Sequence, residues 1–247
     1  KDYVFTVRWG ISTATQDREG AVTGESGVRP ARAAIEAALL AFVGEIQQIP
    51  PQFSAIKING ERAYDLARDG ETVELEARTV IVHEARLVDA PSADLAVIFV
   101  RSGKGFYIRA LVRDLAGKLG AEGHVAALRR TRVGAFRESE STPLAKLQEM
   151  GDKAALDAQL VPLETALDDI PALAVSGEEA SRLRQGREIV LLPHQVEAFR
   201  EMRRPRTING EDASRICLAL DQGKAAALGE VRAGRFIPVR VFNPETE

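Results

Sequence analysis

The segment from Asp94 to Gly120 constrains the fold more than any other part of the chain, because it predicts a strand, a glycine turn and a helix in succession. Residues 94–101 are rich in β-branched and apolar side chains, which is typical of a strand. After two glycines, apolar residues recur at helical spacing as far as Leu119, and Gly120 supplies the stop. The chain is therefore expected to form an α+β fold in which this helix turns its apolar stripe inward.

Tyr107 and Arg109 stand at the start of the predicted helix, directly after the glycine turn. Free backbone N–H groups and the positive end of the helix dipole favour an anionic partner there, either a carboxylate or a phosphate. A plainer alternative is that the glycines only make a turn and that Arg109 and Arg113 form a solvated helix face. This segment by itself leaves both alternatives open.

The charge of the surrounding segment favours the functional alternative. Residues 101–137 contain nine Lys and Arg residues against two acids, a local charge of +7 in a chain whose net charge is −3. A basic segment in an otherwise acidic chain indicates a surface that faces phosphates, and aromatic residues among the cations suit unstacked bases better than a duplex.

Composition bounds the remaining possibilities. The 247 residues, 45% of them hydrophobic, can bury an ordinary core in one or two domains. The single cysteine, Cys217, excludes an internal disulfide, and no Cys or His cluster has the spacing of metal ligands. No apolar run approaches the ~20 residues that span a membrane, and no secretory signal opens the chain. We expect a cytoplasmic protein with no metal and no membrane contact.

The hydrophobic pattern predicts two domains. Alternating side chains predict a strand from Tyr3 to Trp9, followed by a polar loop over residues 12–27. Beyond residue 170, short strands separated by glycine turns suggest a small β-barrel appended to the α+β body. These strands are expected near residues 187–192, 216–221, 225–231 and 236–241. The expected domains are residues 1–165 and residues 170–247.

Six short motifs occur in order within the first 140 residues. They are Lys1-Asp2-Tyr3, Thr13-Ala14-Thr15-Gln16-Asp17, Gln48-Ile49-Pro50-Pro51 with Phe53-Ser54-Ala55-Ile56-Lys57, Ala63-Tyr64, Gly105-Phe106-Tyr107-Ile108-Arg109, and Gly123-His124-Val125 with Leu128-Arg129-Arg130. Together they resemble the bacterial tRNA pseudouridine-55 synthase (tRNA pseudouridine synthase B) family. The resemblance implies a catalytic domain with a mixed, mainly antiparallel sheet, and the C-terminal part resembles more loosely the RNA-binding barrel known as the PUA domain.

The resemblance also implies an activity. The family isomerises one uridine in the T-loop of tRNA, at position 55, by detaching the base from its ribose and rejoining it through carbon, without a cofactor or a metal. Its implied partner is the T-stem-loop of tRNA, and no obligate protein partner is expected. An RNA base cannot react while it is stacked and paired, so it must be flipped out, and its exposed face then needs an aromatic platform.

Residue roles follow from the same resemblance. Tyr3 is expected to stack on the extruded uracil and to act as a general base, Tyr107 to line the nucleotide pocket, and Arg109 to pair with the catalytic aspartate. Further substrate-binding residues implied by the resemblance are Leu128, Asp17, Lys57, Arg129 and Arg130. Without the resemblance, Tyr3 could be a surface aromatic of an edge strand and Leu128 an ordinary core leucine.

The nucleophile of the family does not occur in the sequence. It is an aspartate within Gly-x-Leu-Asp-Pro-x-Ala-x-Gly, and none of the 247 residues forms this motif. We expect it upstream of Lys1, in an ordinary synthase whose N-terminal part is missing here, and we expect the 247-residue chain alone to be poorly soluble or partly unfolded and inactive. Asp17 corresponds to a different acid in a loop.

Two other functions remain open. The chain could be a non-catalytic tRNA-binding or tRNA-folding protein that retains the pocket without the nucleophile. It could also be an interaction module whose basic segment contacts acidic protein partners. Salt dependence separates RNA binding from the latter, because a protein that neutralises several phosphates loses affinity linearly with the logarithm of salt concentration.

Overall fold

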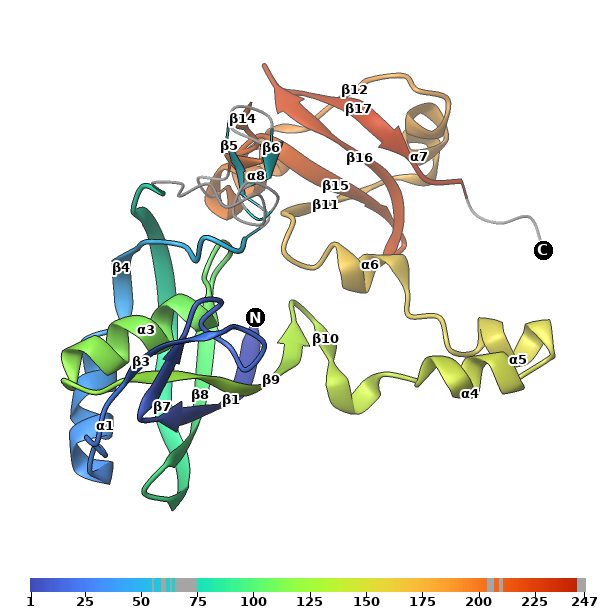
Figure 1. The fold of residues 1–247 in the computed structure, drawn as a ribbon. Coiled ribbons are helices and arrows are strands. Elements are labelled where there is room, and N and C mark those ends of the chain that lie inside the picture. The colour runs from blue at the N-terminus through green and yellow to red at the C-terminus, as the bar shows by residue number, and fades with distance from the viewer. Residues whose placement is uncertain are drawn as a thin grey trace. The chain divides into compact units, whose positions relative to one another are not determined.

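The computed structural model of the chain describes residues 1–54, 56–58, 61–62, 64, 75–203, 207–208 and 211–243. The chain forms two compact units, Lys1–Val133 with Arg137–Glu140 and Gly134–Phe136 with Ser141–Glu247 (Figure 1). Each unit has its own hydrophobic core. The expected domain division between residues 165 and 170 falls inside the second unit and stays a prediction.

Most of the first unit's strands belong to a six-stranded sheet in the order β10-β9-β1-β8-β7-β4. Its strands are β1 (Asp2–Trp9), β4 (Gly44–Gln48), β7 (Arg78–Ser92), β8 (Leu95–Ser102), β9 (Gly123–Val133) and β10 (Phe136–Arg137). Strand β1 lies inside the sheet and is antiparallel to both neighbours, so that Tyr3 faces Val100 of β8 and Arg130 of β9. The expected strand from Tyr3 to Trp9 and the mainly antiparallel sheet are therefore confirmed.

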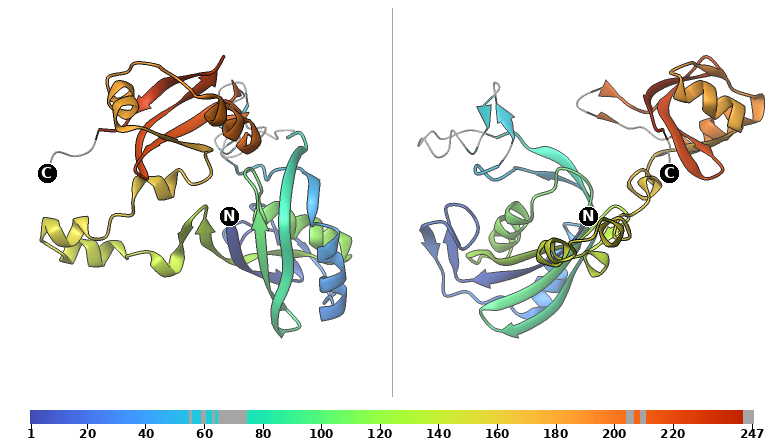
Figure 2. Two further views of the ribbon diagram at one scale, coloured as in Figure 1. Left: turned by 180° about the vertical axis from the view of Figure 1, so that it is seen from behind. Right: turned by 90° about the vertical axis from the view of Figure 1, so that its right-hand side faces the viewer.

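Two helices share one core with this sheet. They are α1 (Arg32–Leu40) and α3 (Ile108–Lys118), and Figure 2 shows them with the sheet from behind and from the side. Phe5, Val7 and Trp9 of β1 are buried in this core, whereas Arg8 between them is exposed, as the alternation of the sequence predicts.

Helix α3 begins where the sequence predicts it, because the residues before it permit a sharp turn out of β8. Gly105 has a φ of 78°, a conformation that glycine adopts without strain. Tyr107 is extended, with φ −116° and ψ 119°, and is the N-cap of the helix. Gly120, with a φ of 63°, follows the other end. Tyr107 and Arg109 therefore stand at the start of the helix as expected.

Residues 12–27 differ from the expectation of a polar loop. They contain most of a hairpin formed by β2 (Ile11–Thr13) and β3 (Val22–Glu25). The side chains of β3 are almost all exposed, so no hydrophobic alternation marks this strand in the sequence. The turn between the two strands is held by polar contacts instead.

The second unit contains a five-stranded sheet. In spatial order its strands are β11 (Ala172–Val175), β15 (Ile216–Asp221), β16 (Lys224–Arg232), β17 (Arg235–Val241) and β12 (Ile189–Val190). The β11–β15 pair is parallel and the other pairs are antiparallel. Within the described residues β11 and β12 are the edges of this sheet, so a closed PUA-like barrel stays a prediction.

Shorter elements complete the described chain. They are β5 (Lys57–Ile58), β6 (Glu61–Arg62), η1 (Glu138–Glu140), α4 (Leu144–Glu149), α5 (Lys153–Asp157), α6 (Leu163–Ala166), α7 (Gly177–Arg184), α8 (Pro193–Met202), β13 (Thr207–Ile208) and β14 (Glu211–Asp212). Cys217 lies in the second core, where burial raises the pKa of its thiol to about 12.

None of the described helices is long and apolar enough to cross a membrane.

Candidate functional site

Arg109, on the first turn of α3, connects two loops that lie far apart in the sequence. Its Nη1 donates to the Thr15 carbonyl at 3.0 Å and to Asp17 Oδ2 at 3.1 Å. Its Nη2 donates to the Phe53 carbonyl at 2.7 Å. A planar guanidinium can meet several acceptors in fixed directions, which the single ammonium of lysine cannot do. Arg109 is therefore held in one position by the protein itself.

Asp17 is fixed just as firmly as Arg109. Its Oδ1 accepts hydrogen bonds from Thr15 Oγ1 at 2.5 Å and from the Glu19 N–H at 3.1 Å, while Oδ2 accepts from Arg109. The Thr13 hydroxyl donates to the Asp17 carbonyl at 2.5 Å. Both carboxylate oxygens are thus occupied, which suits a residue that orients Arg109 and not one that attacks a substrate.

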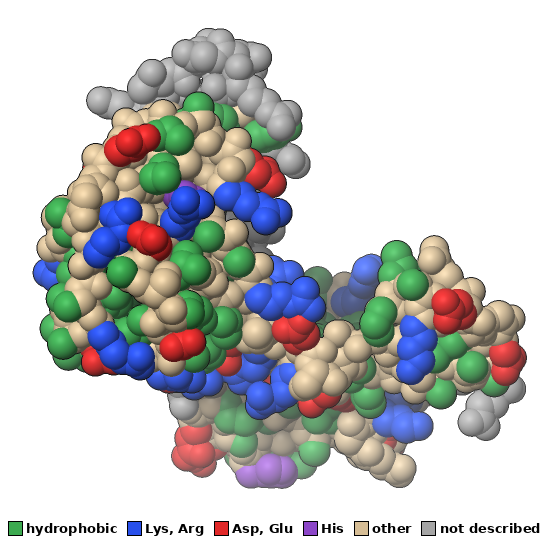
Figure 3. Space-filling model, turned by 60° about the horizontal axis from the view of Figure 1, so that its bottom comes forward, with side chains coloured by type: hydrophobic (Ala, Val, Ile, Leu, Met, Phe, Trp, Pro, Cys, Tyr) green, Lys and Arg blue, Asp and Glu red, His purple; other side chains and the backbone are tan. Residues whose placement is uncertain are grey.

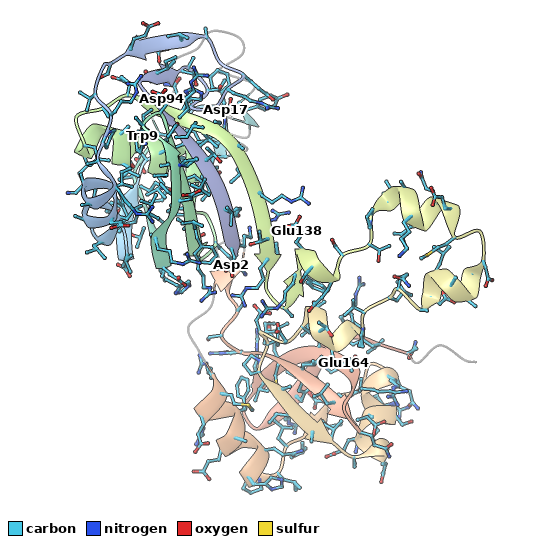
Figure 4. All side chains as sticks on the ribbon, turned by 90° about the horizontal axis from the view of Figure 1, so that it is seen from below. Asp2, Trp9, Asp17, Asp94, Glu138 and Glu164 are labelled. Atoms are coloured by element: carbon cyan, nitrogen blue, oxygen red, sulfur yellow. The ribbon has the colours of Figure 1, made fainter. Side chains whose placement is uncertain are left out.

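A cleft of about 390 Å³ opens beside the Arg109–Asp17 pair. Its lining consists of Asp17, Arg18, Glu19, Arg109, Val125, Ala126, Ala127 and Leu128. Asp17 bridges to Val125 of β9, which ties the loop to this strand; Figure 4 shows Asp17 set apart from Asp2 at the start of β1. Leu128 is 50% exposed, so it is not an ordinary core leucine. A cleft lined by an apolar stretch of β9 and by a guanidinium–carboxylate pair suits a planar ring with polar edges.

The cleft brings together three of the expected site residues, Asp17, Arg109 and Leu128. Tyr3 and Tyr107 are half-buried and, in the described part of the chain, neither is among the residues that line the cleft. Tyr3 packs against the core of the first unit. The side chain of Lys57 lies outside the described residues. The roles expected for these three residues stay predictions.

Arg129 and Arg130 are adjacent and exposed on β9, but their partners differ. Arg129 forms an ion pair with Glu138, and the hydrogen bond and charge of Glu138 raise the pKa of the Arg129 guanidinium. Arg130 has no ion-pair partner within the ranges that the structure describes. The two arginines therefore differ in their availability to a phosphate.

Acids neutralise much of the basic segment, and all of these acids except Asp114 come from outside it. The paired cations are Arg101 with Asp2 and Glu84, Arg109 with Asp17, Arg113 with Asp114, Arg129 with Glu138, and Arg132 with Asp2. Figure 3 shows Lys and Arg side chains interspersed with Asp and Glu on one face of the molecule. The local charge counted along the sequence therefore overstates the positive charge of the surface.

Asp2 anchors two of these cations at the start of β1. Its side chain is 9% exposed and lies 3.1 Å from Arg101 Nε and 3.1 Å from Arg132 Nε. Burial by itself would raise the pKa of the Asp2 carboxyl. The hydrogen bond from Arg101 and the charges of Arg101 and Arg132 outweigh burial, so this pKa lies below its ordinary value.

Two residues of the site were not singled out by the sequence. Thr15 holds both Asp17, through its hydroxyl, and Arg109, through its carbonyl. Gln48 is buried and hydrogen-bonds the backbone of Tyr107. Both lie inside motifs quoted for the family resemblance, but their contacts span the fold and leave no periodic signal along the chain.

Comparison with known proteins identifies the family. Residues 1–108 match the model of the TruB family pseudouridylate synthase N-terminal domain, and residues 109–168 match that of the tRNA pseudouridylate synthase B C-terminal domain. A protein of Caulobacter vibrioides named tRNA pseudouridine synthase B is 53% identical over 242 residues, which cover 98% of this chain and 76% of that protein. The chain belongs to the TruB family of pseudouridylate synthases. A second relative named tRNA pseudouridine synthase B, from Bradyrhizobium diazoefficiens, is 49% identical to this TruB-family chain. The match covers 98% of the present chain and 68% of the relative.

Solved structures show that the TruB-family fold is shared more widely. A chain in the crystal structure of a Cbf5–Nop10–Gar1 complex matches with a TM-score of 0.63 at 20% identity. A chain of an H/ACA ribonucleoprotein bound to a substrate RNA containing 2′-deoxyuridine matches with a TM-score of 0.65 at 18% identity. The present chain spans 65% and 66% of the lengths of these two chains, and these likenesses concern the fold alone.

Proposed function

We propose that this protein isomerises uridine to pseudouridine at position 55 in the T-loop of tRNA. The observation that carries the proposal is the family membership, together with relatives named tRNA pseudouridine synthase B at 53% and 49% identity. The cleft beside Arg109 supports it, because an apolar wall and a fixed cation suit one extruded base. The proposed partner is the T-stem-loop, with no obligate protein partner, and the proposed location is the cytoplasm.

The proposed reaction changes two bonds of the uridine and moves two protons. The N1–C1′ bond of the uridine breaks, the C5–C1′ bond forms, the C5 proton leaves and N1 gains a proton. The atoms balance within the substrate and there is no net oxidation, so the reaction requires no oxidant or reductant. Tyr3 is proposed to stack on the uracil, a contact worth ~1–3 kcal/mol per base, and to act as general base toward the C5 proton. Tyr107 and Leu128 are proposed to contact the nucleotide.

Arg109 is proposed to pair with a nucleophilic aspartate upstream of Lys1. The motif that carries this aspartate in the family is absent from the 247 residues, and the chain covers only 76% of the relative from Caulobacter. An arginine beside a carboxylate keeps it ionised and oriented. We further propose that residues 1–247 alone do not convert uridine and that residues 170–247 form a PUA-like RNA-binding domain.

Tritium release tests the activity. The full-length protein, including the segment encoded before Lys1, is incubated with a tRNA transcript tritiated at carbon 5 of its uridines, and the released tritium is counted. The proposal expects one equivalent per tRNA, and none when uridine 55 is replaced by cytidine. Residues 1–247 alone serve as the matched inactive chain.

Three outcomes separate the alternatives. Release that persists in the cytidine-55 transcript would move the proposed reaction to another position. Tight tRNA binding by the full-length protein without release would instead favour a tRNA-binding or tRNA-folding function. Release by residues 1–247 alone would show that no upstream aspartate is needed.

A further inference from the structure

We infer that Gln48 is a positioning residue of the proposed reaction, because its buried side-chain amide fixes the turn that carries Tyr107 and Arg109. Gln48 is the last residue of β4 and is 1% exposed. Its Nε2 donates to the Tyr107 carbonyl at 3.1 Å, and its Oε1 accepts from the Tyr107 N–H at 2.9 Å. One side chain therefore holds both backbone groups of one residue. This inference rests on the proposed function.

This contact lies at the N-terminus of α3, where it can affect the positions of Tyr107 and Arg109. Tyr107 is the N-cap of α3, and its side chain makes no capping hydrogen bond. The first N–H groups of a helix have no partner within the helix, so the direction in which the chain approaches it is set by outside contacts. The Gln48 amide supplies such a contact. A rotation of the backbone at Tyr107 would move the Tyr107 ring and, two residues on, the Arg109 guanidinium.

The chain that follows Gln48 is tied to the same helix at two further points. Arg113 Nη2 donates to the Ile49 carbonyl at 2.8 Å, and Arg109 Nη2 donates to the Phe53 carbonyl at 2.7 Å. Pro50 and Pro51 lie between these carbonyls and restrict the backbone. Gln48 thus fixes both the helix start and one end of the segment whose carbonyl receives Arg109.

Removal of this amide has a predictable consequence. A buried side-chain amide is tolerated only when its donor and acceptor are both satisfied, and both are satisfied here by one residue. Gln48→Met keeps the length of the side chain and removes both hydrogen bonds. The Tyr107 N–H and carbonyl then lose a partner, and the turn gains rotational freedom. A displacement of about 1 Å of groups that position a substrate can cost about a hundredfold in rate.

The test compares Gln48→Met with Gln47→Met in the full-length protein. Gln47 is the neighbouring residue, and its amide bonds the exposed Thr79 hydroxyl at 2.8 Å, so it controls for the loss of a strand glutamine. At saturating tRNA, kcat per folded molecule is expected to fall about tenfold to a hundredfold in Gln48→Met, with KM and tRNA affinity changed by less than about threefold. In Gln47→Met, kcat is expected to stay within about twofold of the wild type.

The following results would overturn the inference or its basis. A Gln48→Met protein with wild-type kcat per folded molecule would overturn the positioning role, and so would a loss of kcat matched by the loss of folded protein. An inactive wild-type protein would overturn the proposed function itself, and the positioning role with it. If Gln48→Met does not fold, Gln48→Glu is assayed, because a carboxylate still accepts from the Tyr107 N–H but no longer donates to the carbonyl. Its kcat is then expected to fall as well, and an unchanged kcat would refute the role.

Discussion

The start of α3 and the exposed part of β9 both contribute to the cleft, yet they are built in opposite ways. At the start of α3, Arg109 has three acceptors, Asp17 has three donors to its carboxylate, and Gln48 holds the backbone of Tyr107. On β9, Leu128, Arg129 and Arg130 are exposed, and among the residues that the structure describes only Arg129 of the two arginines has an ion-pair partner.

This difference indicates that the start of α3 serves the chemical step and the exposed part of β9 serves binding. Chemistry benefits from groups that are fixed before the substrate arrives, because no reorganisation is then needed in the transition state. Binding of a flexible polyanion needs charge at the right place but no exact orientation, and exposed cations provide this at little cost. We therefore expect substitutions at the start of α3 to change kcat, and substitutions on β9 to change affinity and its salt dependence.

Arg109→Lys has the largest expected effect. A lysine retains the charge but cannot reach the Thr15 carbonyl, the Asp17 carboxylate and the Phe53 carbonyl at the same time. We expect kcat of the full-length protein to fall about a hundredfold to a thousandfold while tRNA affinity changes less than about fivefold. Single-turnover kinetics and filter binding measure the two quantities.

The matched control is Arg32→Lys on α1, where a single exposed ion pair to Glu36 at 3.0 Å is preserved by either cation. Its kcat should equal that of the wild type. If the two lysine variants were equally active, the fixed geometry at the start of α3 would have no catalytic importance.

Gly20→Ala is expected to have a smaller effect than Arg109→Lys, because it disturbs the same site without removing a polar group. An added Cβ would lie 2.5 Å from Thr15 Oγ1 and 2.6 Å from the Thr15 backbone nitrogen. Thr15 would have to move, and Asp17 would lose the hydroxyl that orients it. We expect a loss of about 1–3 kcal/mol in the free energy of unfolding and about a tenfold loss of kcat per folded molecule.

Gly27→Ala controls for the glycine itself, since an added Cβ meets no atom within 4 Å there. The two alanine variants are compared by chemical denaturation and by kcat. Equal behaviour would mean that the position of Thr15 does not matter for the reaction.

Arg130→Ala is expected to act on binding alone. Arg130 is exposed and lacks an ion-pair partner in the described part of the chain, whereas Arg129 is held by Glu138. Each phosphate contact contributes about 0.7–0.9 to the slope of the logarithm of tRNA affinity against the logarithm of salt concentration. We expect Arg130→Ala to reduce the magnitude of this slope by about 0.7–0.9. Arg129→Ala is expected to reduce it by less than half as much. The kcat of both variants is expected to be unchanged. A larger effect from Arg129 would reverse the assignment made from the Glu138 ion pair.

The sequence predicted the regular elements well because their signals are local. Alternation along Tyr3–Trp9 and the helical spacing up to Leu119 reflect burial of one face, and the structure confirms both. The strand expected at residues 216–221 is confirmed with the same bounds. The β2–β3 hairpin escaped prediction because polar contacts, and not a buried face, hold its turn.

The site was less predictable because its interactions are distant along the chain. Arg109 could be selected from its residue type and its motif, but the contact between Gln48 and Tyr107 joins residues 59 positions apart. The charge of the basic segment was overstated for the same reason. Asp2, Asp17 and Glu138 neutralise cations from outside the segment in which those cations were counted.

Asp2→Asn is expected to have the smallest effect on activity, although it lies beside Tyr3. Asp2 is buried against Arg101 and Arg132, so its removal should lower the free energy of unfolding by about 1–3 kcal/mol at neutral pH while kcat stays within about twofold. Its pKa in the folded protein is below the ordinary value, and its contribution is therefore full above about pH 4 and disappears as the pH falls through the folded-state value. Denaturation curves of wild type and Asp2→Asn should accordingly converge in acid.

The control is Asp94→Asn, which alters an ion pair whose carboxylate side chain is 59% exposed. It should change the free energy of unfolding by less than about 1 kcal/mol at neutral pH. A kcat loss in Asp2→Asn as large as in Gly20→Ala would extend the fixed part of the site to the start of β1 and remove the distinction between the two regions.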